Sequence, residues 1–476
     1  MKHLLVALLF LLAPPLRAAD LPPAVIQNLK AAGISLPSVA VVVQPLDAAA
    51  PLVSFNATRP MNPASVMKLI TTYAALDLLG PAHTWKTGAY IDAEPVDGTL
   101  PGNLYIKGSG DPKLALEHFW TLLRQLRVRG ISHIQGDVVL DRSAFEVPPA
   151  NGDFDDKPMR PYNVGPDALL VNFRALRFVL MPAADRVRLL VETPSDGLPV
   201  NNRLQLARGE CRDDWKDRIA VRILPESGGL EFTGSYADRC GEKVLNLAPL
   251  PADAQVGSLF AALWKEMGGT LAGRLRDGAV PAGARLAAEQ ESPALADLVR
   301  DINKFSNNVM ARQLFLALGA DGGTGPATPD KAKQRIAAWL VQRGLAFREL
   351  EMENGSGLSR TERISADSLN RLLVDAWHSP VMAEFMASLP VLGIDGTMKK
   401  RLVDSDARGR GHIKTGTLEG VKTAAGYIQD IRGRRYAVTF LINHPRAREG
   451  QAAIDALLQW VADRGFTPPP AGASPR

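Results

Sequence analysis

The sequence predicts a multi-domain α/β protein in which one mixed domain is interrupted by a long β-rich insertion. The chain has 476 residues, roughly two to three times the usual length of a single domain. Helix and strand patterns occupy both ends of the chain, whereas short strand patterns with turn residues dominate residues 85–284. We therefore expect the two ends to form one discontinuous domain around the insertion.

The composition is that of an ordinary globular protein. Hydrophobic residues make up 46% and charged residues 22% of the chain, which excludes global disorder. The net charge of +5 is a mild excess that favours anionic polymers or membrane surfaces without selecting one. We expect no nucleic-acid partner.

Residues 1–19 are predicted to be a signal peptide. A basic start is followed by the uncharged run from Leu4 to Ala13 and by small residues near Ala19. The alternative is an uncleaved anchor, but the run is shorter than the ~18 to 20 residues that span a bilayer. We expect export to the periplasm and no transmembrane anchor after cleavage.

The N-terminal part is predicted to form a hairpin and a helix. Val-rich runs at residues 38–44 and 52–55 are typical of two paired strands. Pro63 precedes an apolar periodic segment that stops at Gly80, a pattern of Pro at the start and Gly at the end of a helix.

The middle of the chain is predicted to be mostly strands. The expected strands are 103–107, 136–140, 178–181, 186–191, 219–224, 230–236 and 244–247, and the expected helices are 115–127 and 253–267.

The C-terminal part returns to helices and then to a sheet. Four helices are expected first, one starting at Ser292 and the others at 308–318, 331–343 and 365–377. Three strands at 412–417, 421–429 and 434–442 and a last helix at 447–464 are expected to follow. These strands are expected to resume the sheet of the hairpin. Residues 467–476 are rich in Pro and are expected to be a disordered tail.

The two cysteines, Cys211 and Cys240, are expected to form a disulfide in an exported chain. Two cysteines cannot make a zinc site alone, and the common metal and nucleotide motifs are absent from the sequence. We expect no metal and no cofactor, so the chemistry falls to side chains.

The first candidate pair is Ser65 and Lys68, in the only S-x-x-K of the chain. Residues three apart share one face of a helix, so the hydroxyl and the amine can meet. A lysine among apolar neighbours can have its pKa lowered far enough to accept a proton. The alternative is a helix-capping serine beside a solvated lysine.

Two further motifs lie near the C-terminus. Ser306-Asn307-Asn308 falls at the junction of two predicted helices, where helix capping is the alternative. Lys414-Thr415-Gly416-Thr417 lies on a predicted strand and offers a cation and hydroxyls to a carboxylate, although it could be an ordinary exposed strand. The same Lys-Thr-Gly tripeptide occurs at Lys86-Thr87-Gly88. We discount this copy because it follows Lys68 too closely for a Ser-x-Asn motif to lie between them.

In this order the three motifs resemble those of the penicillin-recognising serine acyl transferases. The long gap between Lys68 and Ser306 resembles the insertion of the class C low-molecular-mass penicillin-binding proteins, of the D-Ala-D-Ala carboxypeptidase/endopeptidase type. Residues 162–169, 355–360 and 395–397 with Arg401 also look like this family. Asn354 departs from it, because the family pattern predicts Asp there.

The resemblance implies a serine transpeptidase/β-lactamase-like domain, an antiparallel sheet flanked by helices plus a helical cluster, with large β-rich inserted domains. We expect the catalytic domain at residues 20–85 and 285–466. One inserted domain is expected at 86–160 and 241–284, with a second, 161–240, nested inside it.

The resemblance also implies the roles of the site residues. Ser65 would be the nucleophile, Lys68 its base and Ser306 the proton donor to the leaving amine. Asn308 would bind the substrate amide, and Lys414, Thr415 and Thr417 would bind the carboxylate. Gly416 would let the substrate approach the strand backbone closely. Arg360, with Glu419 as a second candidate, would face the stem-peptide side chain.

The implied partners are peptidoglycan stem peptides ending in D-Ala-D-Ala and their cross-links, with β-lactams as covalent inhibitors. A β-lactamase is one alternative, but no E-x-x-x-N lies between Ser306 and Lys414. A non-enzymatic peptidoglycan-binding relic is the other, and the complete motifs argue against it.

Overall fold

The computed structural model describes residues 21–148, 154–320 and 325–464. The predicted signal peptide (1–19) and tail (467–476) lie outside the described residues. Within those ranges, no helix is long and apolar enough to cross a membrane.

The two ends of the chain share one antiparallel sheet, as predicted. Its strand order is β17-β18-β19-β1-β2, with bounds Gly411–Leu418, Val421–Gln429, Arg435–Asn443, Val39–Pro45 and Val53–Phe55. β1 pairs with β2 on one side and with β19 on the other. The hairpin and its return partner are therefore confirmed.

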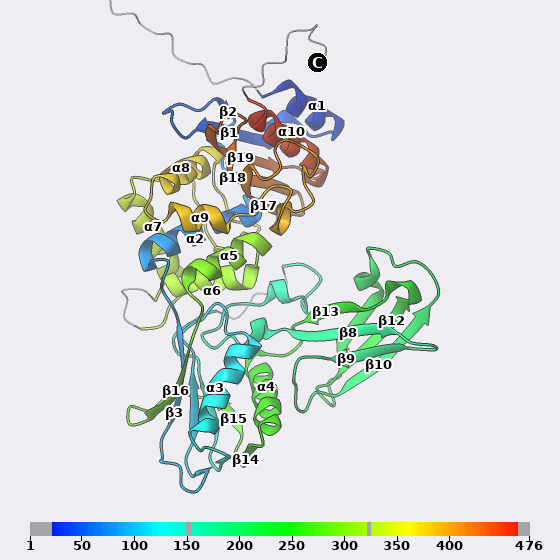
Figure 1. Cartoon of the computed structure of the whole chain (residues 1–476), viewed down its shortest axis with the longest axis vertical. Helices are drawn as coiled ribbons and strands as arrows, with labels where there is room; N and C mark the ends of the chain where they lie inside the picture. Colours follow the sequence, from blue (N-terminus) through cyan, green and yellow to red (C-terminus); the bar gives the residue numbers. More distant parts are fainter. Residues whose placement is uncertain (1–20, 149–153, 321–324, 465–476) are drawn as a thin grey trace, which may run out of the picture.

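Each face of this sheet covers a separate core. Val39, Val41 and Val43 of β1 pack with α1 (Pro23–Ala31) and α10 (Gln451–Ala462), whereas Ala40 and Val42 pack against the helical cluster. This alternation follows from the two-residue period of a strand. Figure 1 shows α1 and α10 on the outer side of the sheet and the helical cluster on the other.

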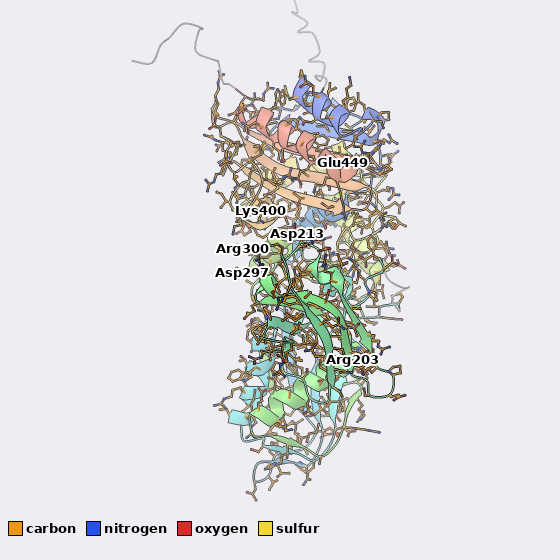
Figure 2. All side chains as sticks on the ribbon, turned by 90° about the vertical axis from the view of Figure 1, so that its right-hand side faces the viewer. Arg203, Asp213, Asp297, Arg300, Lys400 and Glu449 are labelled. Carbon is orange, nitrogen blue, oxygen red and sulfur yellow. A yellow bond between two sulfur atoms is a disulfide. The ribbon has the colours of Figure 1, made fainter. Side chains whose placement is uncertain are left out.

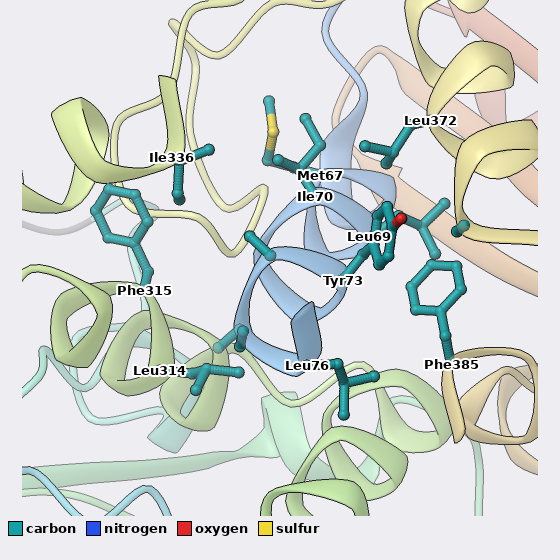
Figure 3. Close-up of a cluster of buried hydrophobic side chains, with 14 of the residues drawn as sticks. Met67, Leu69, Ile70, Tyr73, Leu76, Leu314, Phe315, Ile336, Leu372 and Phe385 are labelled. Atoms are coloured by element: carbon teal, nitrogen blue, oxygen red, sulfur yellow. The ribbon is translucent and has the colours of Figure 1, made fainter. Parts of the chain in front are cut away.

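Helix α2 (Lys68–Leu79) is the centre of the helical cluster. All its residues from Lys68 to Leu76 are buried. Its neighbours are α5 (Leu295–Phe305), α6 (Asn308–Leu318), α7 (Pro329–Gln342), α8 (Ala366–Trp377) and α9 (Met382–Ser388). Figure 3 shows side chains of α6 to α9 around Leu69, Ile70 and Tyr73. Packing on all sides fixes the start of α2, where Ser65 lies.

The insertion forms a second body with its own core. One sheet has the order β15-β7-β5-β3-β16, made of Leu275–Asp277, Val138–Asp141, Leu104–Lys107, Lys86–Ile91 and Arg285–Glu291. A smaller sheet has the order β14-β6-β4, made of Thr270–Leu271, His133–Ile134 and Thr99–Leu100. Helices α3 (Leu116–Val128) and α4 (Ala252–Glu266) pack on this body.

The nested part is a pair of three-stranded sheets around a core of its own. Their orders are β13-β8-β9 (Lys243–Leu247, Leu176–Pro182, Val187–Val191) and β10-β12-β11 (Val200–Ala207, Leu230–Ala237, Ile219–Ile223). Cys211 and Cys240 form the predicted disulfide beside this core. Figure 2 shows the elongated outline of the molecule, with Arg203 of β10 far along the axis from Glu449.

Two expected boundaries differ from the structure. Arg285–Glu291 forms β16 and pairs with β3, so the chain leaves the insertion near Ser292 rather than at residue 285. Lys243–Leu247 pairs with β8, so it joins the nested part rather than the segment 241–284. Both differences come from long-range strand pairing, which local patterns do not encode. The helices α1 and α9 and the strands β3, β4, β6, β10, β14, β15 and β16 were not predicted from the sequence.

Candidate active site

Ser65 lies in a tightly held turn at the start of α2. It belongs to the 3₁₀ turn η2 (Ala64–Met67), and Ala64 has a φ of +46°, which is rare for a residue with a Cβ. The Asn62 Oδ1 accepts a hydrogen bond from the Ala64 N–H at 2.8 Å, and Thr423 of β18 donates to the Pro63 carbonyl at 2.8 Å. The surroundings therefore impose the conformation of this turn.

Lys68 points its amine at Ser65 and is fully buried. Its Nζ lies 3.0 Å from the Ser65 Oγ and 2.7 Å from the Asn308 Oδ1, and it also donates to the Ser356 carbonyl. Burial, and secondly the nearby charge of Lys414, hold the pKa of Lys68 well below its ordinary value. A lysine in this state can accept the proton of a neighbouring hydroxyl.

Ser306 is the residue at which α5 ends, and its backbone is in the left-handed (αL) conformation, with a φ of +55°. The side chain that caps the start of α6 is that of the next residue, Asn307, whose Oδ1 accepts a hydrogen bond from the Met310 N–H. The Ser306 hydroxyl does not have this capping role. The Ser306 hydroxyl instead accepts a hydrogen bond of 2.8 Å from the Nζ of Lys414. The turn thus directs Ser306 and Asn308 into the same cleft.

Lys414 lies on β17, as predicted, and is fully buried. Burial lowers the pKa of Lys414 to about 7. Two residues farther along, a Cβ at Gly416 would lie 2.8 Å from the Pro63 carbonyl oxygen and 2.9 Å from the Ser65 nitrogen. Only glycine lets the strand pass this close to the turn that carries Ser65.

The hydroxyls after Lys414 line the same strand. Thr415 Oγ1 donates to Thr397 Oγ1 at 2.8 Å, and Thr417 Oγ1 accepts from the Nζ of Lys422 at 3.2 Å. Thr397 belongs to the segment 395–397, so this part of the sequence also reaches the cleft. The Lys86-Thr87-Gly88 tripeptide lies on β3 of the insertion, apart from the β17 strand.

Arg360 is half-exposed and connects three segments of the chain. Its guanidinium lies 3.3 Å from the Glu419 carboxylate and 4.6 Å from the centre of the Phe154 ring. Glu419 directly follows β17, and Phe154 comes from the insertion. Arg360 therefore stands where the insertion meets the strand of Lys414.

Residues 353–357 form a loop that the sequence analysis did not place in the site. The Ser356 carbonyl accepts from Lys68, and a Cβ at Gly357 would overlap the carbonyl group of Ala64. The buried Glu362 accepts hydrogen bonds from the amides of this loop. The signal in the sequence was Gly355 and Gly357, which both adopt positive φ.

The insertion also contacts the helices of the site. Arg312 of α6 donates to the carbonyls of Asn163 and Val164 at 3.2 and 3.1 Å, and the buried Gln313 contacts the backbone of Asp167. A cavity of about 310 Å³ lies beside this contact, lined by Tyr162, Phe305, Ser306 and Asn308 among others. Tyr162, at the start of the segment 162–169, thus lines the cavity next to Ser306.

A helix that begins with Ser-x-x-Lys, a Ser-x-Asn turn and a Lys-Thr-Gly strand, brought together on one antiparallel sheet, define a penicillin-recognising serine enzyme. The chain belongs to the D-Ala-D-Ala carboxypeptidase 3 (S13) family, whose model matches residues 25–463. This is a family of serine carboxypeptidases, and the resemblance seen in the motifs is confirmed.

The chain is similar to characterised relatives over most of its length. It is 28% identical over 442 residues to the D-alanyl-D-alanine carboxypeptidase of Actinomadura sp. (strain R39), covering 89% of this chain and 80% of the relative. The crystal structure of penicillin binding protein 4 (dacB) from Haemophilus influenzae matches with a TM-score of 0.75 at 23% identity, covering 88% and 96% of the two chains. A complex of that protein with a β-lactam matches with a TM-score of 0.72 at 23% identity, covering 89% and 96%.

Proposed function

We propose that this protein hydrolyses D-Ala-D-Ala bonds and peptide cross-links of peptidoglycan through an acyl-enzyme on Ser65. The observation that carries the proposal is the pair of lysine–serine hydrogen bonds in one cleft, Lys68 to Ser65 at 3.0 Å and Lys414 to Ser306 at 2.8 Å. Both lysines are buried, so each has a pKa below its ordinary value. Membership of the S13 family supports the same reaction.

In the acylation step, the Ser65 oxygen attacks the carbonyl carbon between the two terminal D-alanines while Lys68 takes the serine proton. The negative oxygen of the tetrahedral intermediate is stabilised by the backbone N–H groups of Ser65 and Thr417. The C–N bond then breaks, Ser306 passes its proton to the departing amine, and the proton that Lys68 took from Ser65 replaces it on Ser306. Water later attacks the ester carbonyl, Lys68 takes a proton from this water, and the proton passes to the Ser65 oxygen as the ester bond breaks.

Substrate binding uses the polar groups that face these two serines. The Asn308 amide holds the peptide bond of the substrate, and the Lys414 ammonium, with the hydroxyls of Thr415 and Thr417, holds the terminal carboxylate. Asn308 already accepts from Lys68 at 2.7 Å, so it couples substrate contact to the position of the base.

The endopeptidase reaction differs only in the leaving group, which is the cross-link amine of a neighbouring stem peptide. Arg360 stands at the junction with the insertion, where a stem-peptide side chain that carries a carboxylate would meet it in exchange for Glu419. A β-lactam presents the same carbonyl and carboxylate, and the H. influenzae protein has been solved with one bound. We expect β-lactams to acylate Ser65.

The test is product analysis with defined muropeptides. The purified mature protein should release D-alanine from a pentapeptide monomer and should split a cross-linked dimer, and Ser65→Ala should abolish both reactions. An exposed serine outside the cleft provides the control, because Ser35→Ala should leave both rates unchanged. Unchanged turnover in Ser65→Ala would refute the assignment, and rapid turnover of nitrocefin would favour a β-lactamase instead.

A further inference from the structure

Glu362 is a buried carboxylate close to the base, and it has no role in the mechanism above. Its side chain is 1% exposed. The Oε1 atom accepts hydrogen bonds from three consecutive backbone amides, those of Glu353, Asn354 and Gly355, each at 3.1 Å. The Oε2 atom has no hydrogen-bond partner among the described residues. Burying a carboxylate in this way is costly unless it has a compensating charge nearby.

The three amides belong to the loop that encloses the Ser65–Lys68 pair. The next carbonyls of this loop accept hydrogen bonds from α2, that of Gly355 from Thr71 at 2.7 Å and that of Ser356 from Lys68. Gly357 then packs directly against the backbone of Ala64. The position of Glu362 therefore sets the position of the carbonyl that receives Lys68.

The charges around Lys68 come from three other elements. Lys414 of β17 and Arg312 of α6 are positive and favour the neutral amine, whereas Glu362 favours the ammonium. Arg312 itself interacts with Glu362 and, to a smaller extent, with Glu353, the carboxylate of the loop. Burial raises the pKa of Glu362, whereas its three amide hydrogen bonds and the charge of Lys68 act in the opposite direction and favour the carboxylate. The ionised Glu362 thus supplies negative charge beside a base whose pKa is lowered by burial and by two cations.

Residue 354 of the same loop is neutral in this chain. Its side chain is that of Asn354, whose Oδ1 accepts from the backbone N–H of Ser356 at 3.0 Å and from its hydroxyl at 2.6 Å. Its Nδ2 donates to the Leu358 carbonyl at 3.0 Å. Asn354 therefore holds the loop by hydrogen bonds without a charge, and the buried carboxylate next to the loop is that of Glu362.

We propose that Glu362 is a positioning residue of the acyl transfer: it folds the 353–357 loop against Lys68 and supplies a negative charge there. The proposal rests on the proposed function, because it assigns Lys68 as the base. Its consequence concerns proton affinity, since an opposite charge nearby raises the pKa of an ammonium. Glu362 keeps the pKa of Lys68 high enough for the amine to take the proton of Ser65.

The experiment measures the rate of acylation by benzylpenicillin as a function of pH. Glu362→Gln keeps the size and the acceptor oxygen but removes the charge, so the acidic limb of the profile should move to lower pH by roughly one unit or more. The plateau rate should fall about tenfold or more because the base is weaker. Glu353→Gln is the matched control, since it removes a carboxylate from the same loop and should leave the limb in place.

A charge-relocation variant separates the electrostatic role from a structural one. In Asn354→Asp/Glu362→Gln, the negative charge is moved to residue 354 and the limb should move back toward that of the wild type. Should Glu362→Gln fail to fold, Asn354→Asp alone still tests the idea, because the added charge should move the limb to higher pH.

A wild-type profile in Glu362→Gln, or a limb in Asn354→Asp that does not move, would overturn the proposal. That result differs from a failure of the proposed function. If Ser65 and Lys68 do not form the acylating pair, the wild type itself gives no adduct and no profile.

Discussion

The Nζ of Lys414 lies 2.8 Å from the Oγ of Ser306, although 107 residues separate the two in the chain and they belong to different elements, a strand and a helix end. This contact parallels that of Lys68 with Ser65 on α2. The cleft therefore contains two buried lysines, each paired with a serine hydroxyl. Since both lysines occupy one cleft, the charge of Lys414 also lowers the pKa of Lys68.

Binding of a carboxylate-terminated substrate should weaken above neutral pH. Burial lowers the pKa of Lys414 to about 7, so the free enzyme carries the ammonium below this pH and loses it as the pH rises. The KM for a D-Ala-D-Ala pentapeptide should therefore rise by roughly 50-fold between pH 7 and 9, because the protonated fraction of Lys414 falls from about one half to about one hundredth. In Lys414→Arg the guanidinium stays protonated, so its KM should be flat over this range. A flat KM in the wild type would contradict the prediction.

The loop beside Ser65 should not tolerate a methyl group at residue 357. Gly357 has a φ of +78°, and a Cβ there would overlap the carbonyl group of Ala64. Gly357→Ala should lower the acylation rate by about 100-fold, because a small displacement of a reacting group is costly.

The control for Gly357→Ala is Gly344→Ala. Gly344 also has a positive φ, of +70°, but a Cβ there meets nothing within 4 Å. Gly344→Ala should lose about 1 to 2 kcal/mol of stability from backbone strain, and Gly357→Ala should lose more because its Cβ also overlaps backbone atoms. Denaturant unfolding measures both losses, and among the folded variants only Gly357→Ala should lose activity. Equal activities in the two variants would show that the close approach to Ala64 is not required.

Removing the disulfide should destabilise the nested part without affecting the chemistry. Cys211 and Cys240 are 29 positions apart and lie at the core between β8 and β12. In the chain-entropy model a loop of this size contributes roughly 3 to 4 kcal/mol. Cys211→Ser/Cys240→Ser should lower the unfolding midpoint while the rate of acylation by benzylpenicillin stays the same. A large loss of that rate would mean that the nested part shapes the cleft.

Contacts within one element could be predicted from the sequence. Ser65 and Lys68 are three residues apart on a helix, so their meeting follows from helical geometry. The placement of Ser306 and Lys414 came from the resemblance, because nothing local brings a helix end to a strand. The hairpin of β1 and β2 followed from Val-rich runs and turn residues, and its pairing is confirmed.

Features made by long-range folding were missed. Glu362 directly precedes Arg363 and follows Arg360 by two positions, in a segment with the composition of an exposed turn, and only the packing of the 353–357 loop buries it. β16 was assigned to the catalytic part because its pairing with β3 bridges the whole insertion. The Lys68–Ser356 contact likewise depends on a loop from the far end of the chain.

The central claim is that Ser65 is the residue that becomes acylated. Mass spectrometry of a tryptic digest after incubation with benzylpenicillin tests it most directly. The account predicts one penicilloyl group on the peptide that contains Ser65, absent when Ser65→Ala is treated in the same way. An unmodified Ser65 peptide, or an adduct on Ser306 or any other residue, would contradict it.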